Sequence, residues 1–188
     1  MVRSAVRDSR QDAILASAQL LIADRGVDAV SMAELAKATG LSRPAIYQYF
    51  ASREHVLAEL VINEMADLSN AIDEKVSAFP DPMERVRIWI HYSLAHLASA
   101  EHRSIRQISM ESLPEESRGM LKSMHGHFMF ALINPLTQLG LPDPTATCHL
   151  LFASVAAAAE RIDAGNDFTR EAAALERFAI AGIEGALG

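Results

Sequence analysis

The chain has 188 residues, half of them hydrophobic, and a net charge of −7. This composition suits a globular protein with a sizeable core and excludes a disordered or fibrous chain. A single cysteine excludes an internal disulfide, and no apolar run approaches the roughly 18 residues that a membrane-spanning helix needs. The first ten residues lack the apolar core of a secretory signal, so we expect a cytoplasmic protein.

Charge is distributed unevenly along the sequence. Residues 1–54 carry seven Lys or Arg and six Asp or Glu, which gives a net charge of +1. The rest of the chain carries ten Lys or Arg and eighteen Asp or Glu, which gives a net charge of −8. All seven histidines also lie after Glu54. The asymmetry is a reason to look for two functions on one chain. A net of +1 favours nucleic acid only if the basic residues gather on one face.

The sequence predicts helices throughout, because apolar residues recur mostly at spacings of three and four and no run alternates as a strand does. Capping residues and glycine or proline stops indicate nine helices. They are expected at about residues 9–26, 32–39, 43–49, 53–78, 82–99, 101–112, 114–135, 145–164 and 169–187. Ser9, Thr145 and Thr169 are the expected starts of the first and the last two helices. Pro135 is expected to bend or end the seventh. We therefore expect an all-α fold.

The most informative pattern lies between Ser31 and Phe50. A capping box at Ser31 starts a short helix that Gly40 ends, and Ser42 caps a second short helix with Pro44 in its first turn. Two short helices around a turn that contains glycine predict a helix-turn-helix. The expected buried residues are Leu35, Ala36, Leu41, Ile46 and Phe50. The expected exposed residues of the second helix are Arg43, Pro44, Ala45, Gln48 and Tyr49. Exposed Tyr and Gln side chains on such a helix suit phosphates and base edges in a major groove.

The stretch from Arg10 to Leu60 resembles the N-terminal domain of TetR-family transcriptional regulators. The similarity rests on the order and spacing of its motifs over roughly fifty residues. These are a first helix of the form AILxxAxxLxxxxG, SMAELA at 31–36, GLS at 40–42, IYQYF at 46–50 and SRE at 52–54. The second half matches the family only in length and helical pattern.

The resemblance implies which side chains contact DNA. Tyr47 and Tyr49 hold positions at which the family contacts phosphates, and Arg53 stands at the phosphate-facing start of the fourth helix, where the family often has lysine. Ser31 and Thr39 fall on the phosphate side of the second helix. The implied base-reading face consists of Ser42, Arg43, Pro44, Ala45 and Gln48. The basic tail that resembles a minor-groove arm contains Arg3, Arg7 and Arg10.

Several of these positions also have a purely structural interpretation. Capping alone explains Ser31 and Ser42. Tyr47 could instead pack on the first helix. Arg43 and Gln48 could instead be ordinary solvated surface residues.

A ligand site is predicted from two stripes of aromatic, methionine and histidine residues at helical spacing. The stripes are Trp89, Tyr92 and His96 on the fifth helix, and Met120, Met124 and Phe128 on the seventh. If the stripes face each other, they enclose a mainly apolar cavity with a few hydrogen-bonding groups. Because the second segment is negatively charged, we expect an apolar or aromatic ligand rather than a polyanion. The alternative is an ordinary helical core.

The last two helices are rich in small and aliphatic residues, which favours close helix packing. The residues concerned are Leu150, Leu151, Phe152, Val155, 156–159, Leu175, Phe178, Ala179, Ile183 and Leu187. We expect a dimer interface of four helices, two from each chain, and the family resemblance implies the same. The alternative is that these helices complete the core of one chain.

The histidines do not have the spacing of metal ligands. His91 and His96 are five residues apart, and His125 and His127 are two apart, which turns them to opposite sides of a helix. No glycine-rich phosphate loop, nucleophile elbow or zinc-protease motif is present. We expect no metal, no cofactor and no enzymatic activity.

These features together predict a ligand-responsive DNA-binding transcriptional regulator. A helix-turn-helix domain is expected over residues 1–52, and a ligand-binding and dimerisation domain over 53–188. The expected protein is a homodimeric repressor that a small apolar or aromatic molecule releases from a palindromic double-stranded operator, with no membrane involved. The alternative is a helical metal-binding or ligand-binding protein, or an enzyme, that does not bind DNA.

Overall fold

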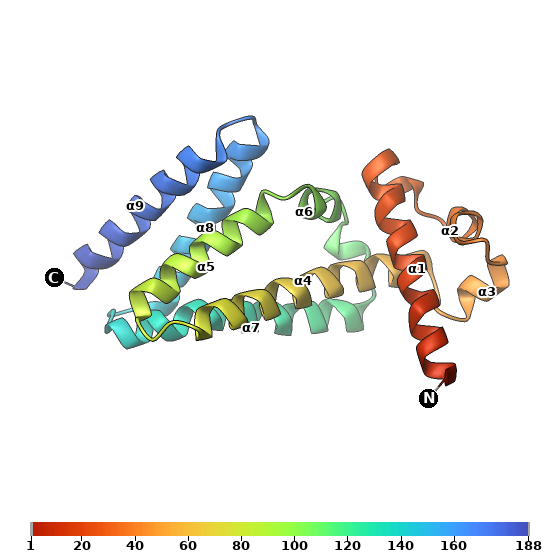
Figure 1. The fold of residues 1–188 in the computed structure, drawn as a ribbon, viewed down its shortest axis with the longest axis horizontal. Coiled ribbons are helices and arrows are strands. Elements are labelled where there is room, and N and C mark those ends of the chain that lie inside the picture. Colours follow the sequence, from red (N-terminus) through yellow and green to blue (C-terminus); the bar gives the residue numbers. More distant parts are fainter. Residues whose placement is uncertain (1, 188) are drawn as a thin grey trace. The chain divides into compact units, whose positions relative to one another are not determined.

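The computed structural model describes the backbone of residues 2–187 and the side chains of residues 9–187. Every regular element in this part of the chain is helical, as Figure 1 shows. The elements are α1 (Val2–Arg25), η1 (Val27–Ala29), α2 (Met32–Thr39), α3 (Arg43–Tyr47), α4 (Arg53–Ser77), α5 (Pro82–Leu97), α6 (Ala100–Ile105), η2 (Met110–Ser112), α7 (Glu115–Leu139), α8 (Pro144–Asp163) and α9 (Phe168–Leu187). The expected all-α fold is therefore confirmed for the described residues.

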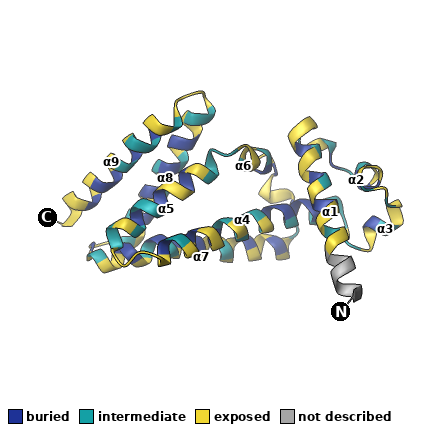
Figure 2. Ribbon diagram, viewed as in Figure 1, coloured by how far each residue is buried: buried dark blue, intermediate teal, exposed yellow. Residues whose placement is uncertain are grey.

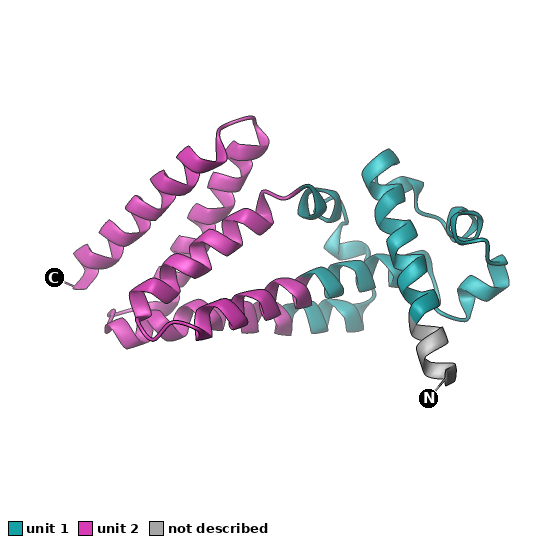
Figure 3. Cartoon of the chain, viewed as in Figure 1, with its two compact units in different colours: residues 1–64, 100–122 teal, residues 65–99, 123–188 magenta. Residues whose placement is uncertain are grey.

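The chain divides into two compact units (Figure 3). Unit 1 comprises residues 1–64 and 100–122, and unit 2 comprises residues 65–99 and 123–188. Helices α4 and α7 each begin in unit 1 and end in unit 2. The division into a DNA-binding and a ligand-binding domain after residue 52 is a statement about function, and it stays a prediction.

The core of unit 1 joins α1 to the helix-turn-helix. On α1, Ile14, Ala18 and Ile22 recur every fourth residue and are buried, which makes one apolar face. This face belongs to a helix that packs against α2, η1 and α6. Leu35 of α2 and Ile46 of α3 are also fully buried, as predicted. These contacts fix the two short helices, which are too short to be stable alone.

The core of unit 2 forms where α5 packs against α8 and α9. Its largest buried side chain is Trp89, whose ring lies 5.0 Å from that of Phe128, centroid to centroid. The Trp89 Nε1–H donates to the Phe128 carbonyl oxygen at 3.3 Å, so the one polar atom of the indole has a partner. Burial raises the pKa of the Cys148 thiol to about 11, so this thiol stays protonated. Figure 2 shows the buried residues along the inner faces of these helices.

Three of the expected helix starts are wrong. Aspartates replace the expected threonines at the starts of two helices, and the first helix begins earlier than expected. The Asp143 side chain accepts from the Ala146 amide at 2.8 Å, so α8 begins just before Thr145. Helix α1 begins at Val2, so Ser9 lies inside it. For α9, the Asp167 carboxylate accepts from the Arg170 amide at 2.9 Å, and it replaces Thr169 as the residue that binds the first turn.

Three other boundaries also differ from the prediction. Helix α3 ends at Tyr47 because the Tyr49 and Phe50 amides both turn back to the Ile46 carbonyl. The single helix expected over residues 101–112 is broken into α6 and η2. Helix α7 does not end at Pro135 but continues to Leu139. The proline ring lies buried there, near the end of the helix, where few intrahelical bonds remain to be lost.

None of the helices in the described part of the chain is both long enough and apolar enough to cross a lipid bilayer.

A paired carboxylate links the last two helices. Arg161, near the end of α8, donates from Nε and Nη2 to the two carboxylate oxygens of Glu171 in the first turn of α9, each at 2.9 Å. These hydrogen bonds hold the pKa of the Glu171 carboxyl below its ordinary value. The pair fixes the connection between α8 and α9 at an otherwise buried carboxylate.

We predict that Glu171→Gln lowers the free energy of unfolding at neutral pH. Because the folded-state pKa of Glu171 is depressed, its stabilising contribution is present above the ordinary carboxyl pKa and is lost as pH falls through the depressed value. The difference between wild type and variant, measured by urea unfolding over a pH series, should therefore shrink on the acid side. Glu184→Gln, on the exposed part of the same helix, is the control, and an equal effect of both variants would contradict the role of the pair.

Candidate nucleic-acid interface

Two side-chain caps build the helix-turn-helix. The Ser31 Oγ accepts from the Glu34 amide at 3.1 Å, and the Ser42 Oγ accepts from the Ala45 amide at 3.3 Å. Between the helices Gly40 adopts a left-handed conformation with φ of 68°, which only glycine takes without strain. The local signals in the sequence are therefore the ones that start and stop these helices.

The outer side of α3 brings together most of the residues predicted to read bases. Arg43, Pro44 and Gln48 are exposed, as is Ser42 in front of them, whereas Ala45 is half-buried. The opposite side of the same short helix is held in the core by Ile46.

The residues predicted to contact phosphates lie in different environments. The Tyr47 side chain is 46% exposed, and the Arg43 guanidinium lies 5.9 Å from its ring centroid. An exposed Tyr47 disfavours the alternative in which this ring packs on the first helix. Tyr49 and Ser31 are half-buried. Thr39 is also half-buried, and its hydroxyl donates to the Leu35 carbonyl at 2.7 Å.

Arg53 has a structural role that the sequence did not predict. Its Nε donates to the Val30 carbonyl and its Nη2 to the Val27 carbonyl, each at 2.8 Å. Its guanidinium also lies 3.8 Å from Asp28 and 3.6 Å from Glu54. The side chain thus ties the turn between α1 and α2 to the start of α4. Its predicted phosphate contact stays a prediction.

The remaining basic side chains of this segment differ in their partners. Arg25 binds the Glu34 carboxylate at 2.9 Å, and this hydrogen bond holds the pKa of Glu34 below its ordinary value. Lys37 on α2 and Arg10 on α1 are exposed and have no hydrogen-bonded acid among the described residues. Lys37 was not among the predicted site residues, although it is the only lysine before Glu54. Of the predicted arm, the side chains of residues 3 and 7 lie outside the described residues.

The predicted ligand residues are only partly brought together. Trp89 and Phe128 touch in the core of unit 2. Tyr92 is exposed, although it is only three residues from Trp89 on the same helix, and His96 and Met124 are half-buried. Met120 is exposed and belongs to unit 1, so it is not part of this cluster.

Unit 2 contains an aromatic cluster that extends beyond the predicted stripes. The Phe152 ring lies 6.4 Å from Trp89 and 6.0 Å from Phe128, and the His125 ring lies 5.5 Å from Phe152. Phe152 is half-buried and His125 exposed, so the cluster reaches the surface of the unit. We call Trp89, Phe128, Phe152 and His125 the aromatic cluster. The same unit holds two buried hydroxyls without a hydrogen-bond partner, on Ser69 and Ser93.

Several histidines in the described part of the chain lie beside carboxylates. His55 Nε2 is 3.8 Å from Glu116. Two further pairs are His102 with Glu64 at 2.7 Å and His127 with Asp73 at 2.9 Å. The expectation that none of the histidines binds a metal stays a prediction.

The apolar residues expected at a dimer interface divide into two sets. Leu151, Val155, Ala159, Leu175 and Ile183 are buried within the chain itself. Leu150 and Phe178, by contrast, are 70% and 66% exposed. The alternative of an intrachain core therefore holds for the first set, because these side chains are buried within one chain.

Comparison with known proteins assigns the N-terminal segment. Residues 14–60 match the bacterial regulatory proteins of the tetR family. The HTH-type transcriptional regulator EthR of Mycolicibacterium smegmatis is 38% identical over 81 residues, which are 43% of this chain and 37% of that regulator. The chain thus spans well under half the length of this curated relative.

Solved structures share the fold over almost the whole chain. FadR from Bacillus subtilis in complex with stearoyl-CoA superposes with a TM-score of 0.75 at 19% identity, covering 90% of this chain and 97% of that chain. AibR in complex with isovaleryl coenzyme A and operator DNA superposes with a TM-score of 0.71 at 22% identity, covering 89% of this chain and 96% of that chain. At these identities the likeness concerns the fold alone. The family match thus concerns residues 14–60, and the solved structures add the fold of the rest of the chain.

Proposed function

We propose that the protein is a ligand-responsive transcriptional regulator that binds operator DNA through α2 and α3. The observation that carries this proposal is the exposed side of α3 and its C-cap, where Arg43, Tyr47 and the capping Gln48 surround a helix anchored by the buried Ile46. A five-residue helix gains little stability from exposed Arg and Tyr side chains and an exposed Gln at its end. These side chains do suit hydrogen bonds to phosphates and base edges.

The side chains have different tasks in this proposal. Arg43 and Gln48 are the base readers, because a guanidinium binds guanine and an amide binds adenine with two hydrogen bonds each. Tyr47 and Tyr49 bind backbone phosphates, with help from Ser31, Thr39 and the exposed Lys37. Arg53 acts mainly as a positioning residue, since two of its donors already bind backbone carbonyls.

The negative net charge of the protein indicates that DNA would be bound by a small part of its surface. The net charge is −7, so DNA is not attracted by the chain as a whole. Affinity must come from a few phosphate contacts and should fall steeply with salt. Selection of DNA from a random pool by the purified protein, at low and moderate salt, provides the operator on which the following prediction is tested.

We predict that Gln48→Ala relaxes specificity at one position of each half-site, with a loss of about 1–3 kcal/mol of discrimination there. Tyr47→Phe, which removes a phosphate hydrogen bond, should weaken all sequences alike. Competition binding with single-base variants of the selected operator measures both effects. The control is Gln19→Ala on the exposed side of α1. An unchanged preference profile for Gln48→Ala would remove Gln48 from the reading face.

We further propose that the protein acts as a homodimer through α8 and α9. Each helix keeps a large apolar side chain in solvent, Leu150 on α8 and Phe178 on α9. Small exposed residues accompany them: Ala153, Ala157, Ala174, Ala181 and Gly182. Small residues around an exposed aromatic ring allow two helices to approach closely. A two-fold dimer would present two α3 helices to the two halves of a palindrome.

We predict that Phe178→Arg converts the dimer to monomers in sedimentation velocity, because a desolvated charge in a helix interface is costly. Leu20→Arg is the matched control, since Leu20 is an equally exposed apolar residue on α1. Val155→Arg is not a suitable test, because Val155 is fully buried within its own chain. A dimer that persists with charges at both Phe178 and Leu150 would contradict an interface on these helices.

We propose that the effector binds against the aromatic cluster of unit 2. Three apolar rings with an imidazole at the surface offer contact area for an apolar ligand. Two of the solved structures with the same fold, FadR and AibR, hold coenzyme A thioesters. In this chain the residues after Glu54 carry a net charge of −8, which favours an uncharged or aromatic molecule. Repression follows if the ligand prefers a conformation with lower operator affinity.

We predict that N-phenyl-1-naphthylamine, an uncharged aromatic probe, is excited by energy transfer from Trp89, the only tryptophan. Phe152→Ala should weaken this binding about tenfold, because it removes a half-buried ring without emptying the core. Phe130→Ala removes an exposed ring from α7 and is the control. If both variants bind the probe as the wild type does, the effector site lies elsewhere.

A further inference from the structure

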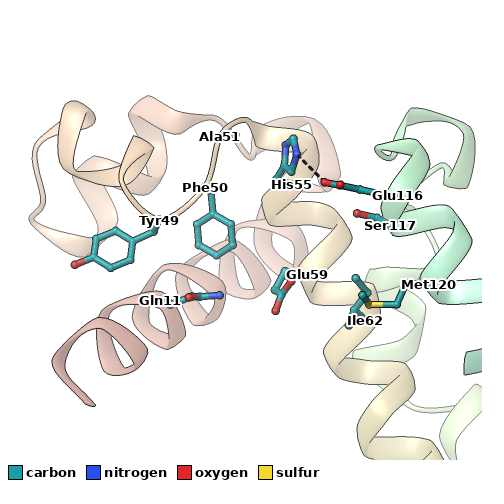
Figure 4. Close-up of a pocket in the computed structure, with 10 residues that line it drawn as sticks. All are labelled: Gln11, Tyr49, Phe50, Ala51, His55, Glu59, Ile62, Glu116, Ser117 and Met120. Carbon is teal, nitrogen blue, oxygen red and sulfur yellow. Dashed lines mark ion pairs between the residues drawn. The ribbon is translucent and has the colours of Figure 1, made fainter. Parts of the chain in front are cut away.

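Unit 1 contains a cavity of about 440 Å³ that shares only Tyr49 with the sites proposed above. It is lined from α1, from the segment that follows α3, from α4 and from the first turns of α7, as Figure 4 shows. This volume falls within the roughly 300–1,000 Å³ of small-molecule sites. A cavity in the helix-turn-helix unit is separate from the aromatic cluster, which belongs to unit 2.

The polar lining of this cavity is acidic. Glu59 and Glu116 contribute two carboxylates, and no lysine or arginine is among the lining residues. Glu116 has His55 as a neighbour at 3.8 Å, which Figure 4 marks as a dashed line. Glu59 is half-buried and has no hydrogen bond or ion pair within the described residues. A partly desolvated carboxylate without a partner favours a cation.

A second polar group lies beside this carboxylate. The Gln11 amide from α1 also lines the cavity and has no partner within the described residues. In Figure 4 the Gln11 and Glu59 side chains both extend into the space beneath the Phe50 ring. An ammonium group is a donor of three hydrogen bonds, so it can bind both the carboxylate and the amide oxygen.

The apolar lining suits an organic body rather than a bare ion. Phe50 is buried, and Tyr49 and Ile62 are half-buried beside it. Met120, from α7, contributes an adaptable thioether. Aromatic faces attract cations as well as apolar groups.

We propose that this cavity binds a protonated organic amine with an aromatic or apolar body. The ammonium group binds the Glu59 carboxylate and the Gln11 oxygen, and the body packs against Phe50 and Met120. Glu116 adds to the negative potential at the rim, where its side chain is mostly exposed.

The cavity also adjoins the proposed recognition helix. Its wall includes Tyr49 and Phe50, whose amides bind the Ile46 carbonyl of α3 at 3.0 and 3.1 Å. A bound amine therefore lies against the segment that follows α3 and that is hydrogen-bonded to α3, and its binding should change operator affinity. This second step rests on the proposed function, whereas binding of the amine does not.

The experiment is calorimetric titration of the full chain with three probes of the same shape. They are phenethylamine, the neutral 2-phenylethanol and the anionic 3-phenylpropionate. We expect the amine to bind at least about tenfold more tightly than the alcohol, with the anion weakest. Glu59→Gln should remove this preference without changing the binding of the alcohol. Glu115→Gln, which removes the same charge from a residue outside the cavity, should leave the preference intact.

Two results would overturn the site: equal affinity for the amine and the alcohol, or an amine affinity that Glu59→Gln leaves unchanged. Circular dichroism of the isosteric Glu59→Gln variant verifies its fold. The link to DNA is measured separately, as the operator affinity with and without phenethylamine in wild type and Glu59→Gln. A chain that binds the amine but no operator would contradict the proposed function and leave the cavity site standing.

Discussion

The geometry of the helix-turn-helix depends on the Arg53 guanidinium. In the turn between α1 and α2 the Val27 carbonyl accepts only one backbone bond, from the Val30 amide at 3.2 Å, and Arg53 supplies charged donors to both the Val27 and the Val30 carbonyls at 2.8 Å. Hydrogen bonds to charged groups contribute about 1.5–3 kcal/mol each. Because Arg53 is the first residue of α4, these bonds fix the entry to α2 against the start of α4. A lysine ammonium carries its three donors on one nitrogen, so it lacks the rigid planar fork with which Nε and Nη2 reach the two carbonyls.

Helix α3 illustrates why that anchoring matters. Five residues make little more than one turn, and a helix of this length has no stability of its own. Its order comes from the Ser42 cap, the buried Ile46 and the turn that brings the Tyr49 and Phe50 amides back to Ile46. All of these lie on its inner side or at its ends. The outer side is therefore free to carry side chains chosen for a partner rather than for folding.

The sequence predicts what is local and misses what depends on distant contacts. Caps at Ser31 and Ser42 and the stop at Gly40 are encoded within a few residues, so α2 and the start of α3 are predicted correctly. The partners of Arg53 are more than twenty residues away, and no spacing rule indicates them. The same holds for Phe152, which joins Trp89 and Phe128 only through packing of α8.

For α8 and α9, the sequence does not predict which apolar residues are buried within the chain, and the reason is a different one. Each of these helices has large apolar residues on its buried side and also on its exposed side, so an apolar residue type does not by itself indicate burial. Only the structure separates Val155 from Leu150. Capping is ambiguous in a similar way, because Asp167 and Thr169 are both good capping residues two positions apart.

Helix α4 sets how two ligands in different units would act on DNA. Arg53 begins it in unit 1, Glu59 lies less than two turns further on, and its last turns belong to unit 2. A ligand at Glu59 acts within the unit that holds α3, so it needs no change elsewhere. A ligand at the aromatic cluster must alter a conformational equilibrium that reaches unit 1 through a continuous helix. In both cases linkage is reciprocal, so operator DNA must change the affinity for each ligand by the factor with which that ligand changes the affinity for DNA. Two ligands that favour different states of α4 would therefore oppose each other even though they bind in separate units.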